Sequence, residues 1–144
     1  MAKDFIAKAS ATIKAPVAKV WDALVDPKKI KQYMFGTEMV SSWKEGSPVT
    51  WKGEWQGKPY EDKGKILKLQ PERVLQYSHF SPLSGLPDKP ENYHTVTIEL
   101  SPQRDQTLIS LSQDKNLTEE ARDDSEKNWT MMLSGLKKLL EATE

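Results

Sequence analysis

His79 and His94 are the only two histidines of the chain, and histidine is the side chain best suited to proton transfer near neutral pH. Each lies in a segment where apolar and polar residues alternate, and the alternation places both rings on the apolar face. Such a pair could orient a ligand or transfer a proton, or both rings could be hydrogen-bonded parts of the core. The sequence places no carboxylate to orient either ring, and no third residue stands at metal-ligand spacing. We therefore predict no metal and no other cofactor.

Large aromatic and sulfur-containing side chains form a second candidate group. Together with the two histidines, the predicted ligand-binding residues are Trp51, Trp55, Tyr77, Trp129 and Met132. Planar rings with polar edges suit an apolar ligand that also makes a few oriented hydrogen bonds. The same rings could instead fill a core in which many neighbouring residues are small. A ligand site predicts a pocket of a few hundred cubic ångströms between these residues, whereas core filling predicts none.

Sequence motifs of familiar catalytic sites are missing. The chain has no Gly-x-Ser-x-Gly, no phosphate-cradling glycine loop, no His-Glu-x-x-His and no cysteine. Adjacent acidic residues such as Glu61 and Asp62 would diverge on a strand rather than flank one bond. We therefore predict no catalytic residue, and a cavity enzyme that uses His79 or His94 is only a third hypothesis.

Composition limits the partners and the compartment. Lys plus Arg equals Asp plus Glu at 21 each, which argues against nucleic acid or an anionic membrane as the main partner. The lack of cysteine fits a reducing compartment. The first residues lack the apolar run of a signal peptide, and no segment approaches the length of a membrane span. These features predict a cytoplasmic protein with one domain over residues 1–144.

Hydrophobic periodicity predicts the elements that must position the candidate residues. Alternation over residues 5–13 indicates a strand, and the next segments indicate a helix from Pro16 and a short helix over 28–34. Period-two alternation then predicts strands over 38–43, 49–56, 60–69, 74–80, 94–100 and 107–113, with a long loop over 81–92. The periodicity over residues 118–142 predicts an amphipathic helix that carries Trp129, Met132, Leu133 and Leu136 on one face.

This order of elements predicts an α+β fold. A curved antiparallel sheet of six to seven strands would wrap around the long C-terminal helix, and the two short helices after the first strand would close one end. Gln113 and Asn128 lie where they could add hydrogen bonds near that helix. Gly135, at the border of its apolar face, indicates either a close approach of another element or tolerance within a long helix.

Three stretches resemble a known family. ATIKAPVAKVWDALVDPKKIKQYM (11–34) is similar to the opening of the SRPBCC (START-like, helix-grip) superfamily. GKILKLQPERVLQYS (64–78) and NLTEEARDDSEKNWTMMLSGLKKLLE (116–141) resemble the central strand pair and terminal helix of its activator of heat shock protein 90 ATPase homologue C-terminal-domain-like family. Tyr33 and His79 depart from this pattern, because tryptophan is common at both positions. The family has no fixed catalytic motif to transfer.

The resemblance implies a cavity between the sheet and the terminal helix, in which members of the superfamily hold apolar molecules. Our first hypothesis is therefore non-catalytic binding of a hydrophobic or aromatic small molecule. The alternative is a co-chaperone-like module that contacts a heat-shock ATPase through its surface in the stress response.

Overall fold

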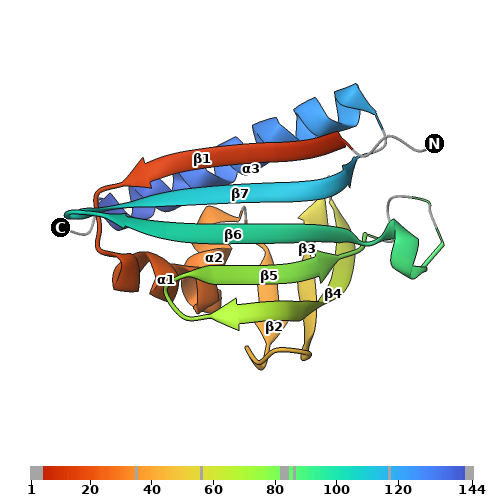
Figure 1. The fold of residues 1–144 in the computed structure, drawn as a ribbon. Helices are drawn as coiled ribbons and strands as arrows, with labels where there is room; N and C mark the ends of the chain where they lie inside the picture. Colours follow the sequence, from red (N-terminus) through yellow and green to blue (C-terminus); the bar gives the residue numbers. More distant parts are fainter. Residues whose placement is uncertain are drawn as a thin grey trace.

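The structure is a computed structural model that describes residues 5–34, 36–55, 57–81, 85, 87–116 and 118–141. Its strands are β1 (Phe5–Ile13), β2 (Glu38–Ser41), β3 (Pro48–Trp55), β4 (Lys58–Gln70), β5 (Val74–His79), β6 (His94–Gln103) and β7 (Gln106–Asn116). The helices are α1 (Val17–Val25), α2 (Pro27–Tyr33), a 3-10 turn over Pro90–Asn92 and α3 (Glu119–Glu141). The seven strands form one antiparallel sheet in the order β1-β7-β6-β5-β4-β3-β2 (Figure 1). The predicted α+β fold is confirmed.

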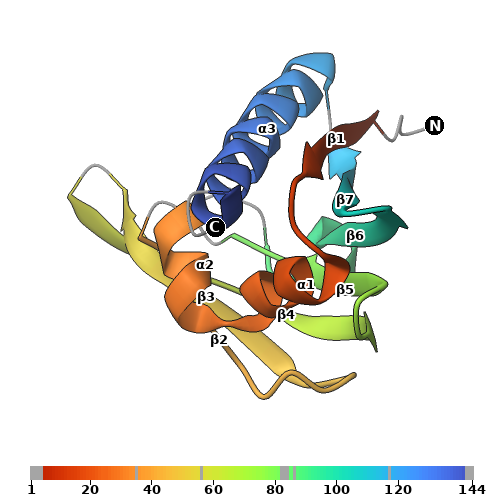
Figure 2. The same cartoon turned by 90° about the vertical axis from the view of Figure 1, so that its left-hand side faces the viewer.

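Helix α3 lies along the sheet edge formed by β1 (Figure 2). A sheet edge exposes unpaired backbone groups, and α3 supplies partners for those of β1. Glu126 accepts a hydrogen bond from the backbone N–H of Lys8 at 3.0 Å, and Glu141 accepts one at 2.9 Å from the backbone N–H of Lys14, the residue after β1. The ammonium of Lys137 donates to the carbonyl of Thr12 at 2.7 Å. These bonds fix the position of α3 over the inner, concave face of the sheet.

The apolar stripe of α3 faces this concave side. Met132, Leu133, Leu136 and Leu140 are buried there. They belong to one cluster with buried side chains of every strand and of α1 and α2, among them Ile13, Met39, Val49, Ile66, Leu75, Ile98 and Ile109. Gly135 faces α2, where a Cβ would lie 3.5 Å from Cβ of Tyr33, an ordinary contact distance. The helix tolerates this glycine, and close packing does not require it.

Several helix and strand ends differ from the predicted ones, and some of the differences have a local cause. Helix α2 begins at Pro27 rather than Lys28, because Asp26 caps it by accepting from the Lys28 N–H at 3.0 Å. Strand β2 ends at Ser41 rather than Trp43, since Trp43 has a φ of 57°, which breaks the extended conformation. Strand β7 continues to Asn116, three residues beyond the predicted end. The predicted strand end at Gln56 lies outside the described residues.

Strand β4 contains an irregularity that the sequence left ambiguous. Ile66 is buried and Leu67 is 37% exposed, as alternation along a strand requires. The pairing with β5 shifts register between Ile66 and Lys68, so that Lys68 is also exposed and Leu69 pairs with the buried Leu75. Nearby, a Cβ on Gly64 would overlap the carbonyl of Ser78, with the carbonyl carbon at 2.6 Å. Only glycine therefore permits this approach of β4 to β5. No helix within the described ranges is long and apolar enough to cross a membrane.

Candidate functional site

A row of polar and aromatic side chains crosses the concave face over four neighbouring strands. Trp51 on β3 is paired with Asp62 on β4, and His79 on β5 is paired with His94 on β6. The Trp51 and His79 rings meet edge to face with centroids 4.9 Å apart, and the two histidine rings are 6.5 Å apart. We call Trp51, Asp62, His79 and His94 the inner-face cluster. Both histidines thus lie on the inner face, as their alternation predicted.

Asp62 orients His79. Its Oδ2 lies 2.9 Å from His79 Nε2, and the side chains are 14% and 28% exposed, respectively. A carboxylate can only accept, so Nε2 carries the proton and Nδ1 of the neutral ring is an acceptor. The other carboxylate oxygen of Asp62, Oδ1, is buried and has no hydrogen-bond partner among the described residues. An orphan carboxylate oxygen is costly and marks a place where a donor is missing.

His94 is fixed by a different partner. Its Nδ1 lies 2.8 Å from the backbone carbonyl oxygen of Asp114, which can only accept. Nδ1 therefore carries the proton, and Nε2 of the neutral ring is the acceptor. The Asp114 carboxylate accepts from the backbone N–H of Thr95 at 2.6 Å, which ties β7 to β6 beside the ring. The inner-face cluster consequently offers acceptors at Asp62, His79 and His94.

Tyr77 and Trp51 form the apolar wall beside these acceptors. Both side chains are buried, and their ring centroids lie 5.2 Å apart. Burial raises the pKa of Tyr77 far above its ordinary value, so its hydroxyl stays neutral. The wall is therefore uncharged and aromatic.

The side of α3 closes the core next to this wall. The indole N–H of the half-buried Trp129 donates to Oε1 of Gln113 on β7. Met132 is buried and, with Tyr77 and neighbouring apolar residues, lines a cavity of only about 10 Å³. That volume is on the order of one water molecule, far below the expected few hundred cubic ångströms. Among the described side chains, the space beneath α3 is therefore filled.

The predicted residues thus divide by position. Trp51, Tyr77, His79 and His94 come together, while Trp129 and Met132 lie on α3 at the edge of the same core. The side chain of Trp55 lies outside those described. Gln113 does bond to the helix, but Asn128 is exposed.

Asp62 is the residue that sequence reasoning missed. The view that no carboxylate accompanies either histidine is wrong for His79. Asp62 comes from the neighbouring strand, and its facing could not be read because of the irregular register of β4. The signal that could have revealed Asp62 is its pairing with the inward-facing Trp51 in the β3–β4 hairpin, since paired residues lie on the same face of a sheet.

The family described as Activator of Hsp90 ATPase homolog 1-like protein matches residues 14–141. This chain belongs to that family. Its sheet curved around a long C-terminal helix is the helix-grip fold of the SRPBCC superfamily. Family membership explains the arrangement of α3 over the concave face.

Solved structures agree with this membership. ChR145 from Cytophaga hutchinsonii is 57% identical, with a TM-score of 0.85 over 96% of this chain and 95% of that one. MLL2253 from Mesorhizobium loti is 19% identical, with a TM-score of 0.79 over 97% and 99%. The Aha1 dimer from Colwellia psychrerythraea is 20% identical, with a TM-score of 0.74 over 95% and 96%. The last two show likeness of fold alone. Among curated proteins no relative matches this chain.

Proposed function

We propose that this protein binds a small apolar or aromatic molecule that carries a hydrogen-bond donor, and does so without catalysis. The observation that carries the proposal is the buried Oδ1 of Asp62, which has no partner among the described residues. Binding a hydroxyl or amino group there would satisfy an oxygen whose isolation costs about 1–3 kcal/mol. The ligand would supply the missing donor.

The rest of the inner-face cluster specifies the same chemistry. In its neutral form each of His79 and His94 has one acceptor nitrogen, because the other nitrogen donates to Asp62 or to Asp114. Acceptors on three side chains favour a phenol, an alcohol or an amine over a carboxylate. The Trp51 ring lies beside His79 and is buried, so the body of the ligand would pack on it by displacing its present neighbours.

The filled core limits where the ligand can lie. A cavity of about 10 Å³ beneath α3 cannot hold an aromatic ring. His79 is 28% exposed, so the cluster is reached from its edge rather than through the core.

A matched pair of probes tests the proposal. 2-Naphthol carries a donor, whereas 2-methoxynaphthalene has the same ring and none. We expect calorimetry and tryptophan fluorescence to give a Kd for 2-naphthol at least about tenfold lower than that for 2-methoxynaphthalene. A tenfold difference is about what one good hydrogen bond contributes. Asp62→Asn should remove this preference, and Asp105→Asn, at an exposed turn, should keep it. Equal affinities for the two probes, or no binding of either, would contradict the proposal.

A co-chaperone-like role is the second candidate, and membership of the family described as Activator of Hsp90 ATPase homolog 1-like protein supports it. In this role the protein would contact a heat-shock ATPase in the cytoplasm during stress. It predicts that the purified protein binds the chaperone and increases its ATP turnover. Unchanged turnover at saturating protein would remove this candidate and leave the ligand proposal standing.

The Asp62–His79 pair also resembles an oriented general base, which keeps the cavity-enzyme hypothesis testable. A base at Nδ1 of His79 would exchange the acidic C–H protons of 2-tetralone for deuterium in heavy water. Exchange no faster than in a His79→Gln variant would eliminate this hypothesis.

A further inference from the structure

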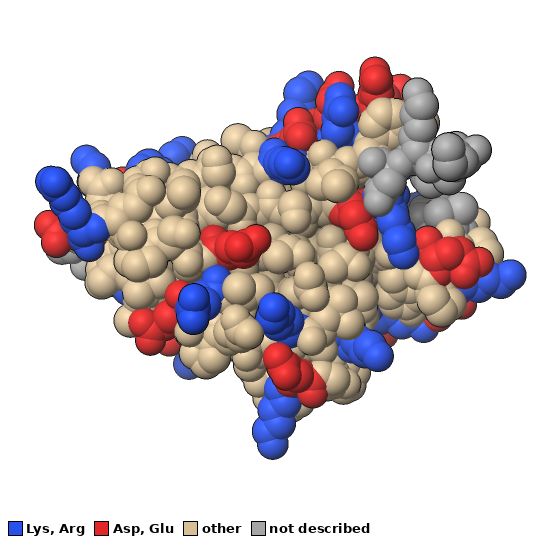
Figure 3. Space-filling model, in the orientation of Figure 1, with Lys and Arg blue, Asp and Glu red and all other residues tan. Residues whose placement is uncertain are grey.

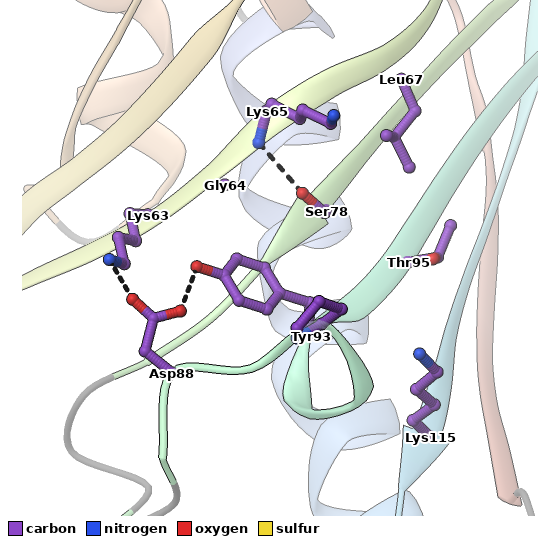
Figure 4. A pocket seen from close by; sticks show the side chains of 10 residues that line it. Lys63, Gly64, Lys65, Leu67, Ser78, Asp88, Tyr93, Thr95 and Lys115 are labelled. Carbon is purple, nitrogen blue, oxygen red and sulfur yellow. Dashed lines mark hydrogen bonds and ion pairs between the residues drawn. The ribbon is translucent and has the colours of Figure 1, made fainter. Parts of the chain in front are cut away.

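A second pocket lies on the outer face of the sheet, on the side away from α3 (Figure 4). Its volume is about 490 Å³, within the range of small-molecule sites. The strands β4, β5 and β6 and the segment before β6 contribute to its lining, with Leu67, Ser78, Thr95, Pro90 and Tyr93 among the residues. We call it the outer-face pocket. None of its described lining residues belongs to the inner-face cluster.

Tyr93 forms an aromatic wall of this pocket that is fixed from behind. One face of its ring stacks on buried Phe80, with centroids 5.1 Å apart. The Tyr93 hydroxyl donates to the Asp88 carboxylate at 2.6 Å, and the same carboxylate contacts the Lys63 ammonium (Figure 4). Because Phe80 covers one face of the ring, a ligand would stack on the opposite face. A ring already held in place loses little conformational freedom when a ligand binds, which favours recognition by stacking.

Hydroxyl groups lie beside this aromatic wall. Ser78 on β5 is paired with Thr95 on β6, so their side chains are neighbours on the outer face. Ser78 Oγ accepts from the backbone N–H of Lys65 at 3.0 Å, which leaves its own proton to donate. A hydroxyl can donate and accept at once, and the two side chains therefore suit a ligand group that does the same.

The charged side chains of the pocket are paired or stand away from its middle. Lys63 is in contact with Asp88, so their charges offset each other. In Figure 4, Lys65 and Lys115 stand at opposite ends of the pocket, and Tyr93 and the two hydroxyl side chains lie between them. Figure 3, in the orientation of Figure 1, shows a surface on which uncharged residues predominate and charged groups are scattered. The middle of the pocket therefore favours a neutral ligand over an ion.

We propose that the outer-face pocket binds a neutral sugar. A pyranose ring carries hydroxyl groups around its edge and C–H groups on its faces. Its hydroxyls exchange hydrogen bonds with Ser78 and Thr95, and one C–H face packs on the open face of Tyr93 and on the 37% exposed Leu67. A purely apolar ligand would cover these hydroxyls without replacing their bonds to water, which lowers its affinity.

A titration of the ¹⁵N-labelled protein, followed by amide chemical shifts, tests this proposal. The probes are the methyl β-glycosides of glucose and galactose and the methyl α-glycoside of mannose. For at least one of them we expect saturable shifts at Leu67, Ser78 and Thr95 with a Kd of about 1–10 mM, because each hydroxyl exchanges a bond to water for a bond to protein. The indole N–H signals of Trp51 and Trp129, on the inner side of the sheet, should not move.

Tetrahydropyran-2-methanol is the matched control ligand, because it has the same ring and a single hydroxyl. We expect it to bind at least about fivefold more weakly than the best glycoside. Equal affinities would show an apolar surface without sugar recognition and would overturn the proposal.

Variants separate stacking from hydrogen bonding. Tyr93→Leu removes the aromatic face and should raise the glycoside Kd at least about fivefold, whereas Tyr93→Phe keeps the ring and should change it less than about twofold. Ser78→Ala with Thr95→Val should raise the Kd about tenfold. Ser101→Ala is the control for the double variant, because Ser101 is an exposed hydroxyl on the same face of β6.

Other results would overturn the outer-face site. They are a lack of saturable binding for all three glycosides, or an unchanged Kd in either Tyr93→Leu or the double variant. Binding of glucuronate more than about tenfold tighter than the methyl glucoside would also overturn it, in favour of an anionic ligand. The ligand comparisons use the unmodified protein, so they decide the proposal even if a variant does not fold. The inner-face cluster is untouched by these variants, and failure of either proposal leaves the other standing.

Discussion

Asp62 Oδ2 lies 2.9 Å from His79 Nε2 across the β4–β5 pair, while Oδ1 of the same carboxylate is buried without a partner among the described residues. One oxygen therefore positions the histidine and the other is left for a donor from outside the described structure. Residues that lower the stability of a protein and have no compensating contact in its fold are typical of binding sites. This relationship distinguishes the cluster from an ordinary polar contact within a core.

Asp62→Asn separates a binding role from a structural one. The amide keeps the shape of the side chain but removes the buried negative charge, so we expect the free energy of unfolding to stay within about 1 kcal/mol of wild type. Urea denaturation measures this, and the 2-naphthol titration measures the lost preference. A loss above about 3 kcal/mol would instead identify Asp62 as part of a structural network.

The contact between Trp129 and Gln113 predicts an energetic coupling between α3 and β7. Trp129→Phe and Gln113→Leu should each destabilise the protein, because each leaves one hydrogen-bonding group without its partner. A double-mutant cycle should give a coupling of about 0.5–1.5 kcal/mol. Additive effects of the two substitutions in chemical denaturation would show that the contact does not fix the helix.

Two glycines should respond to alanine with opposite signs. Gly64→Ala should destabilise the protein by about 2 kcal/mol or more, since the new methyl group would overlap the Ser78 carbonyl. Gly135→Ala serves as the matched control, because its methyl group would meet Tyr33 only at an ordinary 3.5 Å. It should stabilise α3 by about 0.5–1 kcal/mol. Thermal melts that shift in the same direction for both variants would contradict this packing.

Two buried tyrosines predict a loss of stability in alkali. Burial raises the pKa of Tyr33 and Tyr77 above the ordinary value of 10.0. The unfolded chain ionises first, so their contribution is fully present below about pH 10 and is lost as the pH rises further. Each tyrosine lowers the free energy of unfolding by at most about 1.4 kcal/mol per pH unit in this range. Urea denaturation between pH 8 and 12 should show a shallower slope for the Tyr33→Phe, Tyr77→Phe variant, and an unchanged slope would refute the assignment.

Periodicity was sufficient to predict the fold because the elements other than β4 alternate regularly or have a single apolar stripe. The alternation of β3 placed Val49 and Trp51 inside, and the apolar stripe of α3 placed Leu133 and Leu136 inside, as the structure confirms. Ends of elements were less predictable. They depend on single local features, such as the cap formed by Asp26 and the positive φ of Trp43.

The candidate site could be predicted only in part for a related reason. The inward direction of His79 and His94 follows from alternation along one strand, but the partner of His79 depends on the register between strands. A shift of one residue in β4 reverses which side chains face the core, and the sequence does not encode where that shift occurs. The extent to which the core is filled depends on side-chain volumes in three dimensions, so the 10 Å³ cavity could not be predicted either.

A crystal structure of the protein grown with 2-naphthol tests the central claim most directly. The account predicts the naphthol ring against Trp51, with its hydroxyl within hydrogen-bonding distance of Asp62 Oδ1. The account is contradicted if 2-naphthol binds elsewhere and Asp62 Oδ1 still has no hydrogen-bond donor. It is also contradicted if a donor from the protein itself is hydrogen-bonded to that oxygen.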